Sequence, residues 1–141
     1  MNPLEGGTLQ ALSRRIPSVM RSEFGRVIEN LMDVPGSMGA VLVDDDGYAI
    51  DYVYNPKLLD DIDIQIVGAQ LGQSVLQTFG TAAHRDLGTP TIVLEGKEVT
   101  LVASPVGQHY VLTFVMDASV DPSGVLGHFE AVRSTVEHLL T

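Results

Sequence analysis

The carboxylate runs of this sequence are the first candidates for metal chemistry. Asp44-Asp45-Asp46-Gly47 has the composition of a calcium-binding loop. Such loops, however, place their ligands at alternate positions and end in a glutamate, where this chain has Val53. Because Asp and Gly also favour the backbone angles of tight hairpins, the run is predicted to be an acidic turn and not a metal site.

Catalytic groups are present, but they are not grouped as a reaction would need them. His84-Arg85-Asp86 combines an acid–base pair with a cation, yet consecutive helical residues point in different directions and cannot converge on one substrate. The remaining histidines, His109, His128 and His138, lie on separate predicted elements. The absence of cysteine excludes thiolate nucleophiles and cysteine-ligated zinc or iron–sulfur sites.

Nucleotide-hydrolysing and hydrolase motifs are missing as well. The Gly96-Lys97 pair is followed by Glu98 and lacks the upstream glycine of a phosphate-binding P-loop. Neither the Gly-x-Ser-x-Gly turn of serine hydrolases nor the His-Glu-x-x-His zinc motif occurs in the chain. The sequence therefore predicts a protein that is not an enzyme and has no catalytic residue, metal site or cofactor.

The composition indicates one acidic globular domain. The chain has 141 residues, 45% of them hydrophobic, and a net charge of −10 from 18 acidic and 8 basic side chains. This balance excludes a disordered chain and argues against binding to nucleic acid or acidic lipid. No secretory signal or membrane span is recognisable, so a cytoplasmic location is expected. We expect a loose segment over residues 1–15 and a single domain over residues 16–141.

Capping and turn residues divide that domain into eight elements. A first helix is expected from a cap at Ser18 to Val34-Pro35-Gly36, a long helix from Asp60-Asp61 to Leu87, and a last helix opened by Asp121-Pro122. The strands are expected at about 38–43, 48–54, 89–94, 99–104 and 109–116. The order α-β-β-α-β-β-β-α predicts an α+β fold. Its five-stranded, mostly antiparallel sheet has the long helix on one face and the terminal helices on the other.

The long helix carries two apolar faces, whereas a helix on the sheet of a monomer needs only one. Ile62, Ile66 and Ala69 lie on one side at about 100° per residue. The other side is lined by Ile64, Val67, Gly68, Leu71, Gly72 and Val75. We assign this second set to a dimer interface, because small residues in the spacing Gly68-x-x-x-Gly72 let two backbones approach closely. The alternative is a helix buried between the sheet and the terminal helices of the same chain.

A narrow polar band lies between the two apolar faces. It consists of Asp63, Gln70, Ser74, Gln77 and Thr81. Uncharged amides and hydroxyls can hydrogen-bond to a partner at a modest desolvation cost. The band is therefore the candidate partner-binding strip, and the alternative is that it is only the solvent-exposed side of a buried helix.

A family resemblance is carried by the run from Val34-Pro35-Gly36, through the apolar stretch Met38–Val43, to the acidic-glycine turn at 44–47. This run resembles the start of the roadblock/dynein light-chain fold. The charge-poor long helix, the three strands after it and the final helix also match that family, so the resemblance covers roughly residues 18–140. It implies a homodimer or heterodimer whose long helices pack side by side over a sheet continued across the two-fold axis.

The resemblance also implies a binding function. Family members act as scaffolds, as dynein light chains, or as regulators of small Ras-like GTPases. The gliding-motility members stimulate GTP hydrolysis without inserting an arginine finger. The first hypothesis is therefore a dimeric adaptor that binds a small Ras-like GTPase and stimulates hydrolysis by positioning the GTPase's own groups.

Two alternatives stay open. A purely structural dimeric scaffold in a motor or polarity complex would bind its partner regardless of the GDP or GTP state. A small-ligand sensor domain would need an internal pocket lined by a convergent set of polar groups. The sequence does not show such a set.

Overall fold

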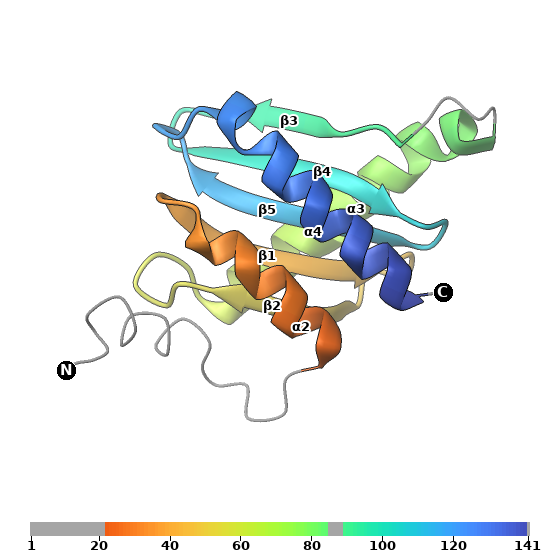
Figure 1. Ribbon diagram of the computed structural model, residues 1–141, viewed down its shortest axis with the longest axis horizontal. Coiled ribbons are helices and arrows are strands. Elements are labelled where there is room, and N and C mark those ends of the chain that lie inside the picture. The colour runs from red at the N-terminus through yellow and green to blue at the C-terminus, as the bar shows by residue number, and fades with distance from the viewer. Residues whose placement is uncertain (1–21, 85–88, 141) are drawn as a thin grey trace.

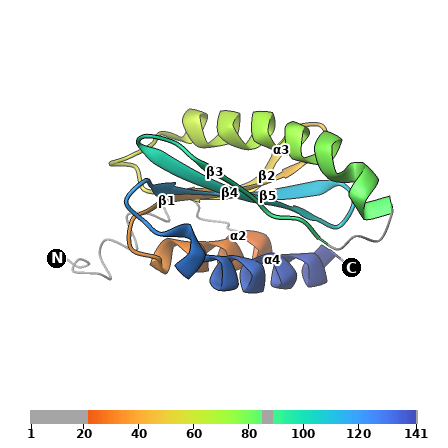
Figure 2. The same ribbon diagram turned by 90° about the horizontal axis from the view of Figure 1, so that it is seen from above.

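A five-stranded sheet lies between two layers of helices (Figures 1 and 2). The computed structural model describes residues 22–84 and 89–140, with the side chains of residues 79–84 excepted. The strand order is β2-β1-β5-β4-β3, and every neighbouring pair is antiparallel. The elements are α2 (Glu23–Ile28), η1 (Glu29–Asp33), β1 (Ser37–Asp44), β2 (Ala49–Tyr54), α3 (Asp61–His84), β3 (Ile92–Glu95), β4 (Val99–Val106), β5 (Tyr110–Asp117), η2 (Pro122–Gly124) and α4 (Leu126–Leu140).

The acidic run is the hairpin turn between β1 and β2 that its composition predicts. Gly47 adopts a φ of 89°, a conformation that favours glycine, and its N–H donates to the carbonyl of Asp44 at 3.0 Å. The carboxylate of Asp44 accepts the N–H groups of Asp46 and Tyr48, each at 3.0 Å. These contacts close the turn and fix the register of the two strands.

The helix boundaries follow local capping chemistry. Ser22 caps α2 by accepting the N–H of Gly25 at 3.2 Å, while the expected cap, Ser18, lies outside the described residues. Asp60 accepts the N–H of Asp63 at 2.8 Å at the start of α3. Asp121 caps the short turn η2 before α4, as the Asp-Pro pair predicts. The predicted end of the long helix at Leu87 and the predicted loose segment 1–15 lie outside the described residues.

Strand β3 begins at Ile92 instead of the predicted Thr89. Pro90 has no N–H to give to a ladder. Its carbonyl accepts a hydrogen bond from the hydroxyl of Ser104 on β4 at 2.7 Å. A side-chain hydrogen bond therefore replaces the backbone ladder at Pro90, and β3 is a short edge strand.

Two apolar layers fill the space between the sheet and its helices. Phe114 and Leu42 meet Phe129 of α4 on one face, and Val43 and Val75 pack together under α3 on the other. Figure 2 shows α3 alone on one face and α2 with α4 on the opposite one. The α+β arrangement predicted from the element order is confirmed. No described helix is long and apolar enough to cross a membrane.

Candidate interaction surface

Helix α3 turns its glycines toward the sheet of its own chain. A Cβ built at Gly68 would lie 2.7 Å from Cγ1 of Val41, and one built at Gly72 would lie similarly close to β1. Ile64 and Val75 are fully buried in the same layer. The assignment of Ile64, Gly68, Gly72 and Val75 to a dimer interface is therefore corrected: these residues seat α3 on its own sheet, and the glycines permit that close approach.

Val67 and Leu71 are the half-buried remainder of the predicted interface, and they lie on one flank of α3. Ala69 marks the opposite flank of α3, because it lies close to Gly47 of the β1–β2 turn. Val67 and Leu71 each stand about 200° from Ala69 around the helix. Their flank therefore faces away from β2, toward β4 and β3, where a second copy could reach it.

The predicted partner strip lies on the outer side of α3. Asp63, Gln70, Ser74 and Gln77 are exposed, and the side chain of Thr81 lies outside the described ones. The hydroxyl of Ser74 donates to the carbonyl of Gln70 at 3.2 Å. From Ile64 to Ala83 the helix carries no charged residue. A long exposed face without charge is typical of a protein-binding surface, because solvated surfaces are rich in charged side chains.

The free edge of the sheet at β3 is open. The N–H of Gly96 donates to Val99 at 2.8 Å, so by the alternation of an antiparallel ladder Val93 and Glu95 direct their backbone groups away from β4. Leu94 lies on the α3 face and is 47% exposed. The sequence-based assignment missed this edge. The signal for it was an apolar strand that ends directly at the Glu95-Gly96 turn.

The opposite edge, at β2, is partly closed. By the same alternation the N–H of Tyr52 points outward, but it donates to the carboxylate of Asp51 at 2.8 Å. The second oxygen of Asp51 accepts the N–H and the hydroxyl of Ser22 at 3.2 and 2.6 Å. A bulge between Leu42 and Val43 also interrupts the ladder. Capped groups and bulges are the devices by which proteins protect an edge strand, so β3 is the better edge for pairing with another chain.

The other chemically suggestive residues do not converge in the part of the chain that the structure describes. Carboxylate oxygens of Asp44, Asp45 and Asp46 lie within 4.8 Å of one another, but Asp44 holds the turn and Asp45 lies 2.9 Å from Nδ1 of His109. The side chain of His84 and residues 85–86 lie outside the described ones. The Asp45–His109 pair is exposed, with 48% and 66% of the two side chains accessible.

An open cavity of about 670 Å³ lies on the α2–α4 side, between η1 and η2, and none of the predicted site residues lines it. Its polar lining is already engaged: Ser119 donates to the carboxylate of Asp117, and His128 lies 2.9 Å from the carbonyl of Asn30. The lining therefore does not supply the convergent polar set that the small-ligand alternative needs.

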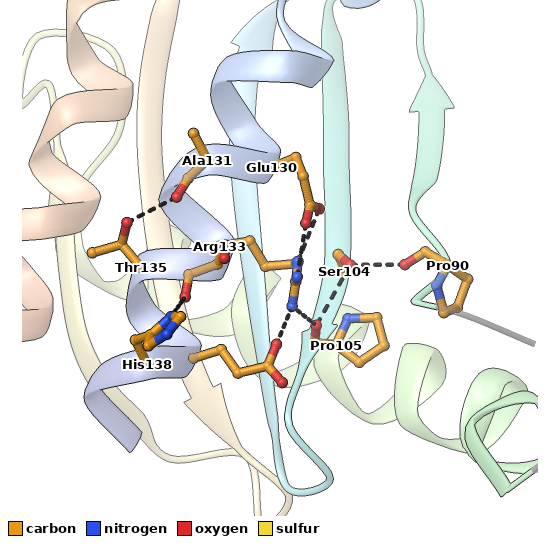
Figure 3. Close-up of polar contacts among 10 residues, drawn as sticks. Pro90, Ser104, Pro105, Glu130, Ala131, Arg133, Thr135 and His138 are labelled. Atoms are coloured by element: carbon orange, nitrogen blue, oxygen red, sulfur yellow. Dashed lines mark hydrogen bonds and ion pairs between the residues drawn. The ribbon is translucent and has the colours of Figure 1, made fainter. Parts of the chain in front are cut away.

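Arg133 of α4 is held by two glutamates of its own helix (Figure 3). Its guanidinium donates to both carboxylate oxygens of Glu130 at 2.9 and 2.7 Å and to Glu137 at 2.5 Å, and it contacts the carbonyl of Pro105 on β4 at 3.5 Å. The hydrogen bond to Arg133 lowers the pKa of Glu130, since it stabilises the charged carboxylate. With 6% of its surface exposed, Arg133 fastens α4 to the sheet and is not available to a partner.

No family model matches the sequence, and neither does any curated protein. Solved structures do. The gliding protein MglB of Thermus thermophilus has a TM-score of 0.68 and 16% identity over 85% of this chain and 93% of that one. A structure of MglB with a tetrameric arrangement has a TM-score of 0.66 and 17% identity over 85% and 92%. A roadblock/LC7 domain of Streptomyces avermitilis has a TM-score of 0.64 and 25% identity over 85% and 100%.

Proposed function

We propose that this chain, which has the roadblock/LC7 fold, is a cytoplasmic, dimeric adaptor that binds a small Ras-like GTPase and has no active site of its own. The observation that carries the proposal is the exposed face of α3, which has no charged residue from Ile64 to Ala83. This face would contact two neighbours: a second copy on the flank nearer β3, and a GTPase on the outer side.

The dimer would form by antiparallel pairing of β3 with β3 of a second copy. Val93 and Glu95 offer unpaired backbone groups there, and Leu94 offers an exposed apolar side chain. The same pairing would bring the second copy's long helix to the flank of Val67 and Leu71. Self-association is known for a similar fold, since MglB has been solved in a tetrameric arrangement.

The GTPase would contact the outer strip, Asp63, Gln70, Ser74, Gln77 and Thr81, doubled by the dimer. The amides of Gln70 and Gln77 can hydrogen-bond to a partner without the desolvation cost of a carboxylate. Stimulation of hydrolysis would act by holding the GTPase's own catalytic groups in position. Arg133 is committed to Glu130 and Glu137 and supplies no finger.

The experiment has two parts. Light scattering over a dilution series should give a mass near twice 15.1 kDa. The purified dimer is then titrated calorimetrically with small Ras-like GTPases from the same genome, each loaded with GDP or with a non-hydrolysable GTP analogue. Preference for one nucleotide state, lost in the Gln70→Glu/Gln77→Glu variant while the dimer persists, is the expected result.

Two results would overturn the proposal. A monomeric mass at all concentrations would show that the chain does not dimerise. Binding that is the same in both nucleotide states, and unchanged by the double substitution, would favour a purely structural scaffold whose contact lies elsewhere.

A further inference from the structure

Large apolar side chains are exposed on the flank of α3 that faces β2. Ile62 is 62% exposed and Ile66 is 49% exposed, one helical turn apart. Large apolar side chains grouped in this way mark interaction sites more often than ordinary surface.

The contacts of α3 show that these side chains share one side of the molecule. Gln65 donates to the hydroxyl of Tyr52 on β2 at 3.4 Å. A Cβ at Gly47, in the turn before β2, would lie 3.5 Å from the Cβ of Ala69. We call Ile62, Ile66 and Ala69 the β2-side patch. It lies on the flank of α3 opposite to Val67 and Leu71, so the second copy proposed above would leave it open.

The patch has an acidic rim. Asp60, Asp61 and Asp63 are exposed at the amino-terminal end of α3, and Asp45 and Asp46 are exposed at the turn beside it. Between Val27 and His84 the sequence has a single Lys or Arg, Lys57. On the strand below, burial and then the charge of Asp61 raise the pKa values of Tyr52 and Tyr54.

We infer that the β2-side patch binds an amphipathic segment of a partner protein whose apolar side chains are flanked by lysine or arginine. Ile62 and Ile66 would take the apolar side chains, and the aspartates of the rim would face the basic ones. An anionic membrane or a nucleic acid would be repelled by the same rim. A second copy of this chain would set one acidic rim against another. The inference rests neither on dimer formation nor on GTPase binding.

The test uses the full chain labelled with ¹⁵N and two synthetic amphipathic helical peptides of about 14 residues, roughly four turns. One peptide is built from Leu and Lys, and the other from Leu and Glu in the same pattern. Amide shifts should change on titration with the Leu/Lys peptide and should concentrate at Ile62, Ile66 and Ala69. The Leu/Glu peptide should leave these shifts unchanged.

Variants test whether the peptide binds through the patch or only through the negative charge of the chain. Ile62→Ser/Ile66→Ser should weaken the binding of the Leu/Lys peptide by at least about tenfold, roughly 1.4 kcal/mol. Leu139→Ser, which alters an exposed apolar residue of α4, should leave the affinity unchanged. Thermal unfolding of each variant checks that the fold is intact.

Four results of the peptide titrations would overturn the inference. They are no binding of the Leu/Lys peptide, equal binding of the two peptides, equal affinity of the double variant, and shift changes spread over distant acids such as Glu95 and Glu98. Shifts at the patch that change on dilution of the chain alone would also overturn it, because they would assign the patch to a second copy. The assay measures neither mass nor nucleotide state, so it can fail independently of the proposed function.

Discussion

A Cβ atom at position 72 would stand 2.5 Å from Cγ2 of Val43, well inside van der Waals contact. Helix α3 therefore lies on β1 at a distance that only glycine allows. Gly68 repeats the contact one turn earlier, against Val41. The spacing that looked like a motif for bringing two chains together brings a helix onto its own sheet.

Gly72→Ala should lower the free energy of unfolding by about 1–3 kcal/mol, because Val43 or the helix must move to make room. Gly127→Ala is the matched control. It lies in α4 with nothing within 4 Å of the added methyl group, and alanine should be neutral or stabilise by up to about 1 kcal/mol. Urea unfolding followed by circular dichroism measures both. Equal effects of the two substitutions would contradict the close approach.

Thr113 of β5 is fully buried beneath α3, and its hydroxyl has no hydrogen-bond partner among the described residues. Removal of a buried, unsatisfied hydroxyl by an isosteric methyl group recovers the cost of its desolvation. Thr113→Val should therefore stabilise the fold by about 1 kcal/mol. Thr135→Val, which deletes an exposed hydroxyl bonded to Ala131 on α4, should give no such gain. Thermal unfolding at matched protein concentration distinguishes the two.

The Arg133 cluster should make stability depend on pH. Arg133→Met removes hydrogen bonds to two carboxylates and should cost about 1.5–3 kcal/mol near neutral pH. The lowered pKa of Glu130 means that the folded state favours the charged carboxylate. Its contribution is therefore present above the pKa of unfolded glutamate and is lost as the pH falls through the folded value.

The difference in the free energy of unfolding between the parent chain and Arg133→Met should accordingly shrink as the pH is lowered from about 7 to about 3. Urea unfolding at a series of pH values measures it. Arg26→Met, at an exposed site on α2, should show no such dependence. If the difference in the free energy of unfolding stays constant with pH, Arg133 stabilises the fold by packing alone.

Leu94→Lys should dissociate the proposed dimer, because a charge on the α3 face of β3 would be buried when two edges pair. The expected result in analytical ultracentrifugation is a monomer at concentrations where the parent chain is a dimer. Leu139→Lys places the same charge on exposed α4 and should leave the dimer intact. A dimer that survives Leu94→Lys would locate the contact away from β3.

The order of elements could be predicted from sequence because local chemistry decides it. Asp44 and Gly47 make the turn that their backbone preferences require, and Asp121 caps the turn before α4. Strand β3 was misplaced at Thr89, because the competing hydrogen bond from Ser104 to Pro90 joins residues far apart in the chain.

Which side of α3 faces the sheet could not be predicted in the same way. Both flanks of the helix are apolar, so periodicity alone does not say whether Ile62 or Ile64 faces the sheet. The volume left by Val41 and Val43 decides it, since only the glycine side fits. The exposed strip through Gln70 and Gln77 was placed correctly on the outer side, because a polar band is excluded from a buried layer. What the strip binds remains a proposal.

Helix α3 confines its charge to its first turn, at Asp61 and Asp63, and the remainder as far as Ala83 is neutral. Salt screens attraction between exposed charges beyond about 8 Å at physiological ionic strength, whereas strongly hydrated salts reinforce apolar burial. A rise in the concentration of a strongly hydrated salt should thus weaken the proposed contact of a basic segment at the amino-terminal end and strengthen apolar contacts proposed along the neutral length. The two surfaces proposed on one helix would then respond to such a salt in opposite directions.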